Sequence, residues 1–185
     1  MPRLILVGGG CRSGKSAFAL RRARALGERP ERRVFLATGQ AFDDEMRARI
    51  AAHRAERGDD FVTREAPTAL VEAIAALDPA RVDVVLVDCL TLWLSNLLLA
   101  DWSEARIRAE IDRLVEVSAA RRVHILLVTN EVGMGVVPES ALGRRFRDLA
   151  GIAHQRLAAV ADEIHAALLG CVLRLHPGPV ERHAV

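Results

Sequence analysis

Short apolar runs alternate along the chain with longer stretches in which apolar residues recur every three or four positions. The short runs are rich in β-branched residues and predict strands at Leu4–Val7, Val34–Ala37, Val84–Val87, His124–Val128 and Ala167–Leu175. The longer stretches predict helices at Lys15–Leu26, Asp43–Arg57, Thr68–Leu77, Leu90–Leu99, Glu104–Ala120 and Ser140–Ala161. Strands that alternate with helices favour an α/β fold, in which a mainly parallel sheet carries helices on both faces.

The same patterns describe one domain. The 185 residues are enough to bury a hydrophobic core without disulfides or a structural metal. No internal repeat, low-complexity tract or linker divides the sequence. We therefore expect a single domain over residues 1–176, followed by a loosely held C-terminal tail over residues 177–185.

The composition indicates which kinds of ligand the protein binds and in which cellular compartment it works. The 26 basic and 24 acidic residues leave a net charge of +2, so we expect small ligands and no nucleic acid. Cys11, Cys89 and Cys171 form no CxxC pair, which is typical of a reducing compartment. The first apolar run is too short for a signal peptide, and the longest, Leu90–Ala100, is too short for a membrane span. We expect a cytoplasmic protein with no membrane span.

A glycine-rich segment links the first predicted strand to the first predicted helix. It matches the P-loop pattern GxxxxGK(S/T) through Gly9, Gly10, Cys11, Arg12, Ser13, Gly14, Lys15 and Ser16. Its glycines let backbone N–H groups surround phosphate oxygens, and the positive end of the following helix favours the anion. Lys15, the one lysine of the chain, should neutralise the β- and γ-phosphates, and the Ser16 hydroxyl should ligate Mg²⁺. The pattern indicates an enzyme that uses a nucleoside triphosphate.

Asp88 follows the predicted strand Val84–Val87 at its carboxyl end. A carboxylate in this place can hold Mg²⁺ together with Ser16, directly or through water. Asp88 also precedes the predicted helix Leu90–Leu99, where an aspartate often serves only as a helix cap. The sequence leaves both roles open.

His53 lies between two arginines on one face of a predicted helix. Arg49 and Arg57 stand four residues to either side, and two such cations would disfavour the imidazolium and attract a phosphate. A neutral, nucleophilic ring of this kind would suit a nucleotidyl-histidine intermediate. Met46 and Ile50 share the same stripe, however, and spacing alone favours a histidine that is merely packed in the core.

Two further groups of polar residues have open roles. Asn130 and Glu131 directly follow a predicted strand, where α/β sheets place ligand contacts, but a structural cap is equally compatible. Four arginines on the last long helix suit phosphate or subunit contacts, or a solvated helix face: Arg144, Arg145, Arg147 and Arg156.

Several segments together resemble the family of bifunctional adenosylcobinamide kinases and adenosylcobinamide-phosphate guanylyltransferases of cobalamin biosynthesis. The resemblance is carried by Gly8–Ser16, Asp43–Arg57, Val87–Leu98, Asn130–Glu139 and Arg144–Gly151. It spans nearly the whole chain, and the NEVGMGVVPE run at Asn130–Glu139 is its most specific part apart from the RIxxH segment that ends at His53.

The resemblance implies a RecA-like P-loop fold, a homotrimer and two reactions. The first phosphorylates the aminopropanol hydroxyl of adenosylcobinamide with ATP or GTP, and the second transfers GMP from GTP to adenosylcobinamide phosphate. It also implies that His53 becomes guanylylated, which reverses the interpretation drawn from spacing. By the same resemblance the nucleotide contacts beyond the P-loop are Thr38, Gly39, Gln40, Arg54, Arg57, Glu65 and Asp88.

One departure from the family pattern concerns position 154, where His154 stands in place of an asparagine before Gln155. Any ligand role at this position is therefore open. Two other functions use the same P-loop: a small-molecule kinase without the transferase step, in which His53 is a core residue, and a RecA-like ATP-binding module that assembles on a partner.

Overall fold

A computed structural model describes residues 1–41 and 43–184, without the side chains of Arg49 and of residues 181–184. In chain order the elements are β1 (Leu4–Gly9), α1 (Lys15–Leu26), the 3₁₀ turn η1 (Pro30–Arg32), β2 (Arg33–Ala37), α2 (Asp44–Arg57), β3 (Val62–Glu65), α3 (Leu70–Ala75), β4 (Val84–Asp88), α4 (Leu90–Leu99), α5 (Glu104–Ala119), β5 (His124–Asn130), α6 (Ala141–Ala158), β6 (Glu163–Leu168), β7 (Cys171–His176) and β8 (Glu181–Ala184). None of the helices in this part of the chain is long and apolar enough to cross a membrane.

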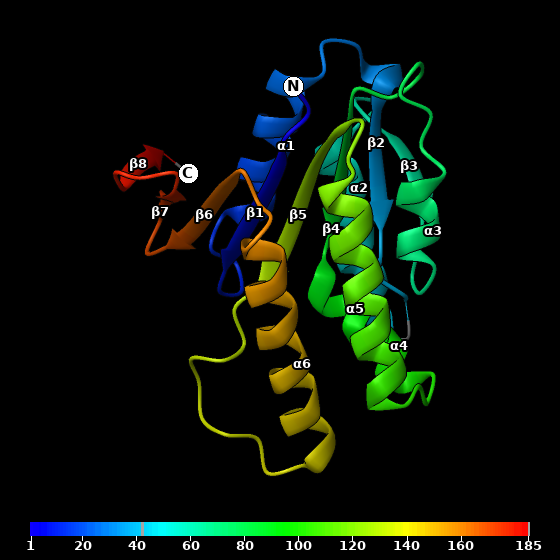
Figure 1. Cartoon of the computed structure of the whole chain (residues 1–185), viewed down its shortest axis with the longest axis vertical. Coiled ribbons are helices and arrows are strands. Elements are labelled where there is room, and N and C mark those ends of the chain that lie inside the picture. The colour runs from blue at the N-terminus through cyan, green and yellow to red at the C-terminus, as the bar shows by residue number, and fades with distance from the viewer. Residues whose placement is uncertain (42, 185) are drawn as a thin grey trace.

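The strands of the described residues form one sheet in the order β3-β2-β4-β5-β1-β6-β7-β8 (Figure 1). The pairs from β3 to β6 are parallel, and β7 and β8 are added antiparallel at one edge. The prediction of a mainly parallel α/β sheet is confirmed. Parallel order brings the carboxyl ends of the central strands to one edge, where ligands bind in such folds.

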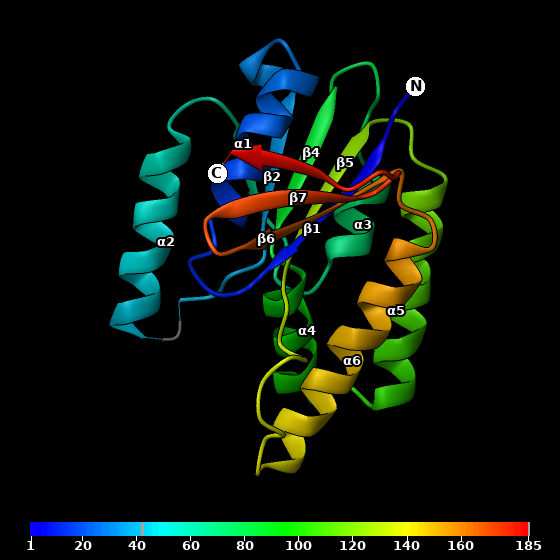
Figure 2. The same cartoon turned by 90° about the vertical axis from the view of Figure 1, so that its left-hand side faces the viewer.

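Helices cover both faces of the sheet, as Figure 2 shows, with α1 and α2 on one side and α3 to α6 on the other. Within β1 alternate residues serve the two layers: Leu4 and Leu6 pack with α3 to α6, and Ile5 and Val7 pack with α1. On α4, Trp93 is fully buried. Burial of one such large apolar side chain stabilises the fold by roughly 2–3 kcal/mol.

The C-terminal edge differs from the prediction. The expected single strand Ala167–Leu175 is wrong, because Leu169 and Gly170 form a two-residue turn with φ of 51° and 74° between β6 and β7. Positive φ at both positions is the geometry of a tight hairpin, but the apolar run around Gly170 hides it. The tail is not loosely held throughout, since Glu181–Ala184 pairs with β7 as β8.

The remaining differences concern short elements. The sequence missed β3, because all four of its residues are exposed at the sheet edge and so carry no apolar signal. Helix α3 is shorter than the predicted Thr68–Leu77, and α6 ends at Ala158 rather than Ala161.

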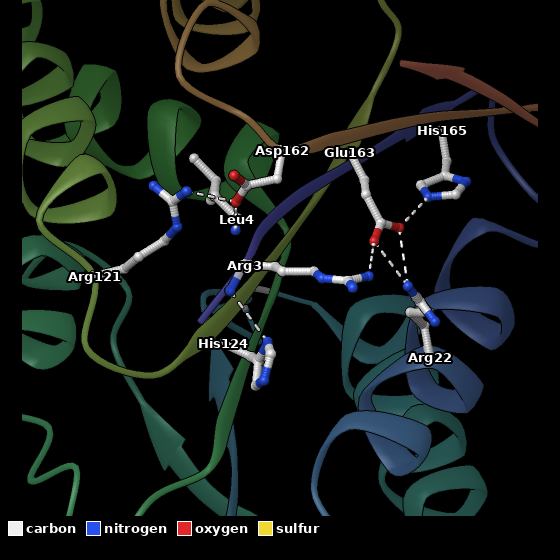
Figure 3. A network of polar contacts seen from close by, with 8 residues as sticks. All are labelled: Arg3, Leu4, Arg22, Arg121, His124, Asp162, Glu163 and His165. Atoms are coloured by element: carbon white, nitrogen blue, oxygen red, sulfur yellow. Dashed lines mark hydrogen bonds and ion pairs between the residues drawn. The ribbon is translucent and has the colours of Figure 1, made fainter. Parts of the chain in front are cut away.

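A polar network ties the start of β6 to β1 and α1, as Figure 3 shows. The Glu163 carboxylate accepts hydrogen bonds from Arg3 at 2.7 Å and Arg22 at 2.8 Å, and lies 3.1 Å from Nε2 of His165. Burial by itself raises the pKa of Glu163, but the hydrogen bonds from His165 and Arg3 and the charge of Arg22 lower it to about 2. This network lies at the amino ends of the strands, away from the P-loop.

Candidate active site

The P-loop connects the carboxyl end of β1 to the first turn of α1, the context that the motif requires. A Cβ at Gly9 would lie 2.7 Å from the backbone oxygen of Ala167, so the loop passes too close to β6 for a side chain. Gly14, with φ of 88°, caps α1. The buried Lys15 donates from Nζ to the carbonyl oxygen of Gly10 at 3.0 Å, which places its ammonium against the loop itself.

Asp88, at the end of β4, lies beside the P-loop helix, where the Ser16 hydroxyl donates a hydrogen bond to its carboxylate. Burial raises the pKa of Asp88, and the Ser16 hydrogen bond and the positive charges of His53, Lys15 and Arg57 oppose that rise. One hydrogen bond and three charges, from the P-loop and from α2, therefore act on this carboxylate.

The alternative role of Asp88 as a helix cap does not hold. The N-cap of α4 is Cys89, and no side chain of the described residues caps that helix. The Asp88 carboxylate is thus not engaged by the first turn of α4.

Residues at the ends of β2 and β3 adjoin the same edge. Ala37 pairs with Asp88 on one side and with Glu65 on the other, so the two carboxylate residues flank the end of β2. Thr38 follows directly, and its buried hydroxyl accepts from the N–H of Cys89 and donates to the Cys89 carbonyl, both at 2.8 Å. The Thr38 side chain therefore holds β2 to β4, while the half-buried Gly39 and Gln40 lead into the site.

His53 lies on the half-buried face of α2. Its side chain is 41% exposed, and its Nδ1 atom lies 3.6 Å from the Glu56 carboxylate. The interpretation of a packed core histidine is therefore wrong. Among the described residues of α2 only Arg57 is buried. Few other parts of the protein therefore pack against this helix, and the His53 side chain is accessible to a ligand.

Of the two arginines that the spacing placed beside His53, only Arg57 has a described side chain. Arg57 turns to the sheet, where its guanidinium lies 3.8 Å from the ring centroid of Phe35, and the side chain of Arg49 lies outside the described part. Burial lowers the pKa of Arg57 and the charge of Asp88 opposes this. Its buried Nε atom has no hydrogen-bond partner within the described part of the chain, which suits a phosphate contact. Arg54, also a predicted contact, is exposed.

A second group of polar residues adjoins the P-loop at the end of β5. The Asn130 side chain donates to the Thr91 hydroxyl at 2.9 Å, and the Glu131 backbone N–H donates to the carbonyl of Gly9 at 3.0 Å. His154 reaches the same place from α6, with Nδ1 3.6 Å from the Glu131 carboxylate. The sequence left these roles open, and the tertiary structure brings the residues together.

Two of the four arginines of α6 brace the segment after β5, while Arg144 and Arg145 remain exposed and Arg156 pairs with Asp112. Arg144 donates to the carbonyls of Pro138 and Glu139, and Arg147 donates to the carbonyl of Gly133. These two side chains are committed to the loop of residues 131–140.

A parallel sheet with a P-loop after β1 and a carboxylate at the end of β4 defines a P-loop NTPase of the RecA-like kind. Two solved structures share the fold. One is an ATPase domain that aligns with a TM-score of 0.53 and 12% identity, over 97% of this chain and 79% of that one. The other is the RadB recombinase, which aligns with a TM-score of 0.52 and 15% identity, over 99% of this chain and 87% of that one.

Within that class, residues 5–175 match the family described as cobinamide kinase / cobinamide phosphate guanyltransferase, and the chain belongs to that family. The bifunctional adenosylcobalamin biosynthesis protein CobU of Salmonella typhimurium is 42% identical, over 93% of this chain and 99% of the relative. The protein CobP of Pseudomonas aeruginosa, with the same description, is 41% identical over 95% of this chain and 98% of its own.

Proposed function

We propose that the chain phosphorylates the aminopropanol hydroxyl of adenosylcobinamide with ATP or GTP, and then transfers GMP from GTP to adenosylcobinamide phosphate, giving adenosylcobinamide-GDP. Family membership and the descriptions of the relatives support this assignment. The observation that carries it is the environment of Asp88: Ser16 of the P-loop hydrogen-bonds its carboxylate, and the charges of Lys15 and of His53 and Arg57 on α2 act on it.

In the kinase step the P-loop positions and neutralises the triphosphate. Backbone N–H groups and the positive end of α1 hold the phosphate oxygens, and Lys15 balances the charge that develops during transfer. The work of the protein in such a reaction is mainly orientation and electrostatic stabilisation.

Ser16 and Asp88 are the residues that would hold Mg²⁺. Their hydrogen-bonded oxygens are hard donors, and Mg²⁺ uses only one or two protein oxygens besides water and substrate phosphates. The described residues contain no cluster of three or more histidine, cysteine or carboxylate ligands. When bound, Mg²⁺ supplies charge neutralisation at the β- and γ-phosphate oxygens.

For the transferase step we assign His53 as the nucleophile. Its Nδ1 atom faces Glu56, so an N–H there leaves the Nε2 lone pair for the α-phosphorus of GTP. The new N–P bond forms as the bond to pyrophosphate breaks, and a phosphate oxygen of the acceptor then displaces His53. Arg57 lies where it can balance the charge of the transferring phosphate.

The same reasoning extends to the assembly. We propose a homotrimer in the cytoplasm, with adenosylcobinamide, its phosphate and a nucleoside triphosphate as the ligands and no nucleic acid. Exposed apolar side chains at Met134, Val136 and Val137, in the loop after β5, support a subunit contact there. Light scattering coupled to gel filtration measures the mass, and a monomer would contradict the trimer.

The experiment that tests the function follows label from GTP into the protein. Wild type incubated with Mg²⁺ and GTP labelled at the α-phosphate should retain label that is lost in acid and kept in base, as a phosphoramidate requires. His53→Ala should carry none, whereas His176→Ala, which removes an exposed histidine on β7, should label like wild type.

The outcomes separate the rival functions. Unlabelled wild type that still phosphorylates cobinamide is a plain kinase, and nucleotide binding without cobinamide-dependent turnover describes a binding module. Equal label on wild type and His53→Ala contradicts the choice of nucleophile.

A further inference from the structure

A cavity of about 350 Å³ opens beside the P-loop, on the side of β5 and α4. It is lined by Cys11, Thr91, Leu92, Ser95, Asn130, Glu131, Val132 and Phe146. Its wall thus combines hydroxyl, amide and carboxylate groups with three apolar side chains. It adjoins the phosphate loop directly through Cys11.

The Glu131 carboxylate is held in a defined orientation at this cavity. Its Oε1 atom accepts a hydrogen bond from the Gly133 N–H at 2.6 Å, and its Oε2 atom faces Nδ1 of His154 at 3.6 Å. The Glu131 backbone is bound to the carbonyl of Gly9, the first residue of the P-loop. The carboxylate is therefore fixed relative to the phosphates that the loop would bind.

His154 lies against the Glu131 carboxylate and is itself held by a residue of β5. Its Nε2 atom lies 2.7 Å from the hydroxyl of the buried Thr129. Burial lowers the pKa of His154, which favours the neutral ring, and the Glu131 charge opposes this. If Thr129 donates to Nε2, the Nδ1–H of His154 points at Glu131. A base whose direction is set by a third hydrogen-bonding group is the arrangement that activates a hydroxyl in many enzymes.

Glu131 is the one carboxylate on the cavity wall among the described residues, and Cys11 is the other titratable group. Asp88, the nearest alternative, already accepts from Ser16 and is surrounded by positive charge. An incoming hydroxyl at this cavity would therefore meet Glu131 as its proton acceptor.

We infer that this cavity receives the hydroxyl-bearing arm of the kinase substrate and that Glu131 is the general base, with His154 as a positioning residue. The inference rests on the kinase step of the proposed function. The acceptor oxygen forms a bond to the γ-phosphorus while the bond from that phosphorus to the β–γ bridging oxygen breaks. The hydroxyl proton passes to Glu131, the nucleoside diphosphate leaves, and the 39% exposed carboxylate returns the proton to solvent.

Glu131→Gln tests the base without removing the acceptor for Gly133. In steady-state assays with cobinamide and ATP, kcat of the kinase step should fall by about 10²- to 10⁴-fold. The KM for ATP should change little, and guanylylation of His53 from GTP alone should remain, which also reports a folded protein. Glu139→Gln, an exposed glutamate of the same loop, is the matched control and should keep wild-type kcat.

His154→Ala tests the positioning role. It should lower kcat with little effect on the KM for ATP, and His154→Asn, which retains an N–H donor, should recover part of that loss. Kinase kcat within about threefold of wild type for Glu131→Gln, against the loss that a general base requires, overturns the inference, although the kinase itself stands. Absence of kinase activity in the wild type instead overturns the proposed function.

Discussion

Replacing Gly9 with alanine probes how tightly the P-loop is packed on β6. The new Cβ would lie 2.7 Å from the backbone oxygen of Ala167 and 2.7 Å from the Ser13 hydroxyl. The Ser13 side chain can rotate, but the Ala167 carbonyl belongs to a strand that pairs with β1 at this position. The start of the loop must therefore shift. Overpacking of this kind costs about 1–3 kcal/mol, and about 2 kcal/mol lowers the Tm of a chain of this size by roughly 4–8 °C.

The same shift misaligns the N–H groups that meet the phosphates. Loss of one hydrogen bond to a charged oxygen, about 1.5 kcal/mol, weakens nucleotide binding by about tenfold. Thermal unfolding measures the first effect, and calorimetric titration with ATP and Mg²⁺ measures the second. Gly10→Ala is the matched control for the unfolding measurement, because apart from its chain neighbours no described atom lies within 4 Å of its Cβ position.

Two results would refute this reasoning. If Gly9→Ala has the Tm and ATP affinity of wild type, β6 can move away from the new Cβ without loss of stability. A Gly10→Ala protein that is destabilised as strongly shows that the contact with Ala167 is not the cause.

Two further predictions concern stability. The pKa of Glu163 in the folded state, about 2, lies below its ordinary value of 4.5, so its stabilising contribution is present above pH 4.5 and disappears as the pH falls through 2. Allowing for the half-exposed Arg3, this amounts to about 2 kcal/mol, and urea unfolding should show a shallower pH dependence in that window for Glu163→Gln than for wild type. Thr38→Val leaves the buried N–H and carbonyl of Cys89 without their hydroxyl partner, and should lower the free energy of unfolding in urea by about 2 kcal/mol. Thr38→Ser keeps the hydroxyl and should retain most of the stability. Equal losses in the two variants would contradict the role of the hydroxyl.

Local patterns sufficed where one segment of the chain carries the whole signal. The α/β class followed from the alternation of apolar runs with helical spacing, and the place of the P-loop followed from a motif between a strand and a helix. Asp88 could be located because it ends a short, buried strand, β4, whose apolar residues mark its position in the sequence. In contrast, β3 has no apolar face, and the turn at Leu169–Gly170 lies inside an apolar run, so neither was visible in the pattern.

The sequence by itself determined the class of fold and the phosphate loop and, through resemblance, led to the proposal of His53 as the nucleophile. Only the tertiary structure decided which residues meet. The guanidinium of Arg57 packs over the ring of Phe35, and Thr38 hydrogen-bonds Cys89, 51 residues away. Glu131 lies near His154 because the neighbouring Thr129 hydroxyl of β5 lies 2.7 Å from Nε2 of that histidine on α6. Such contacts depend on strand order and helix packing, which minimise exposed apolar surface over the whole chain and leave no mark within a single segment.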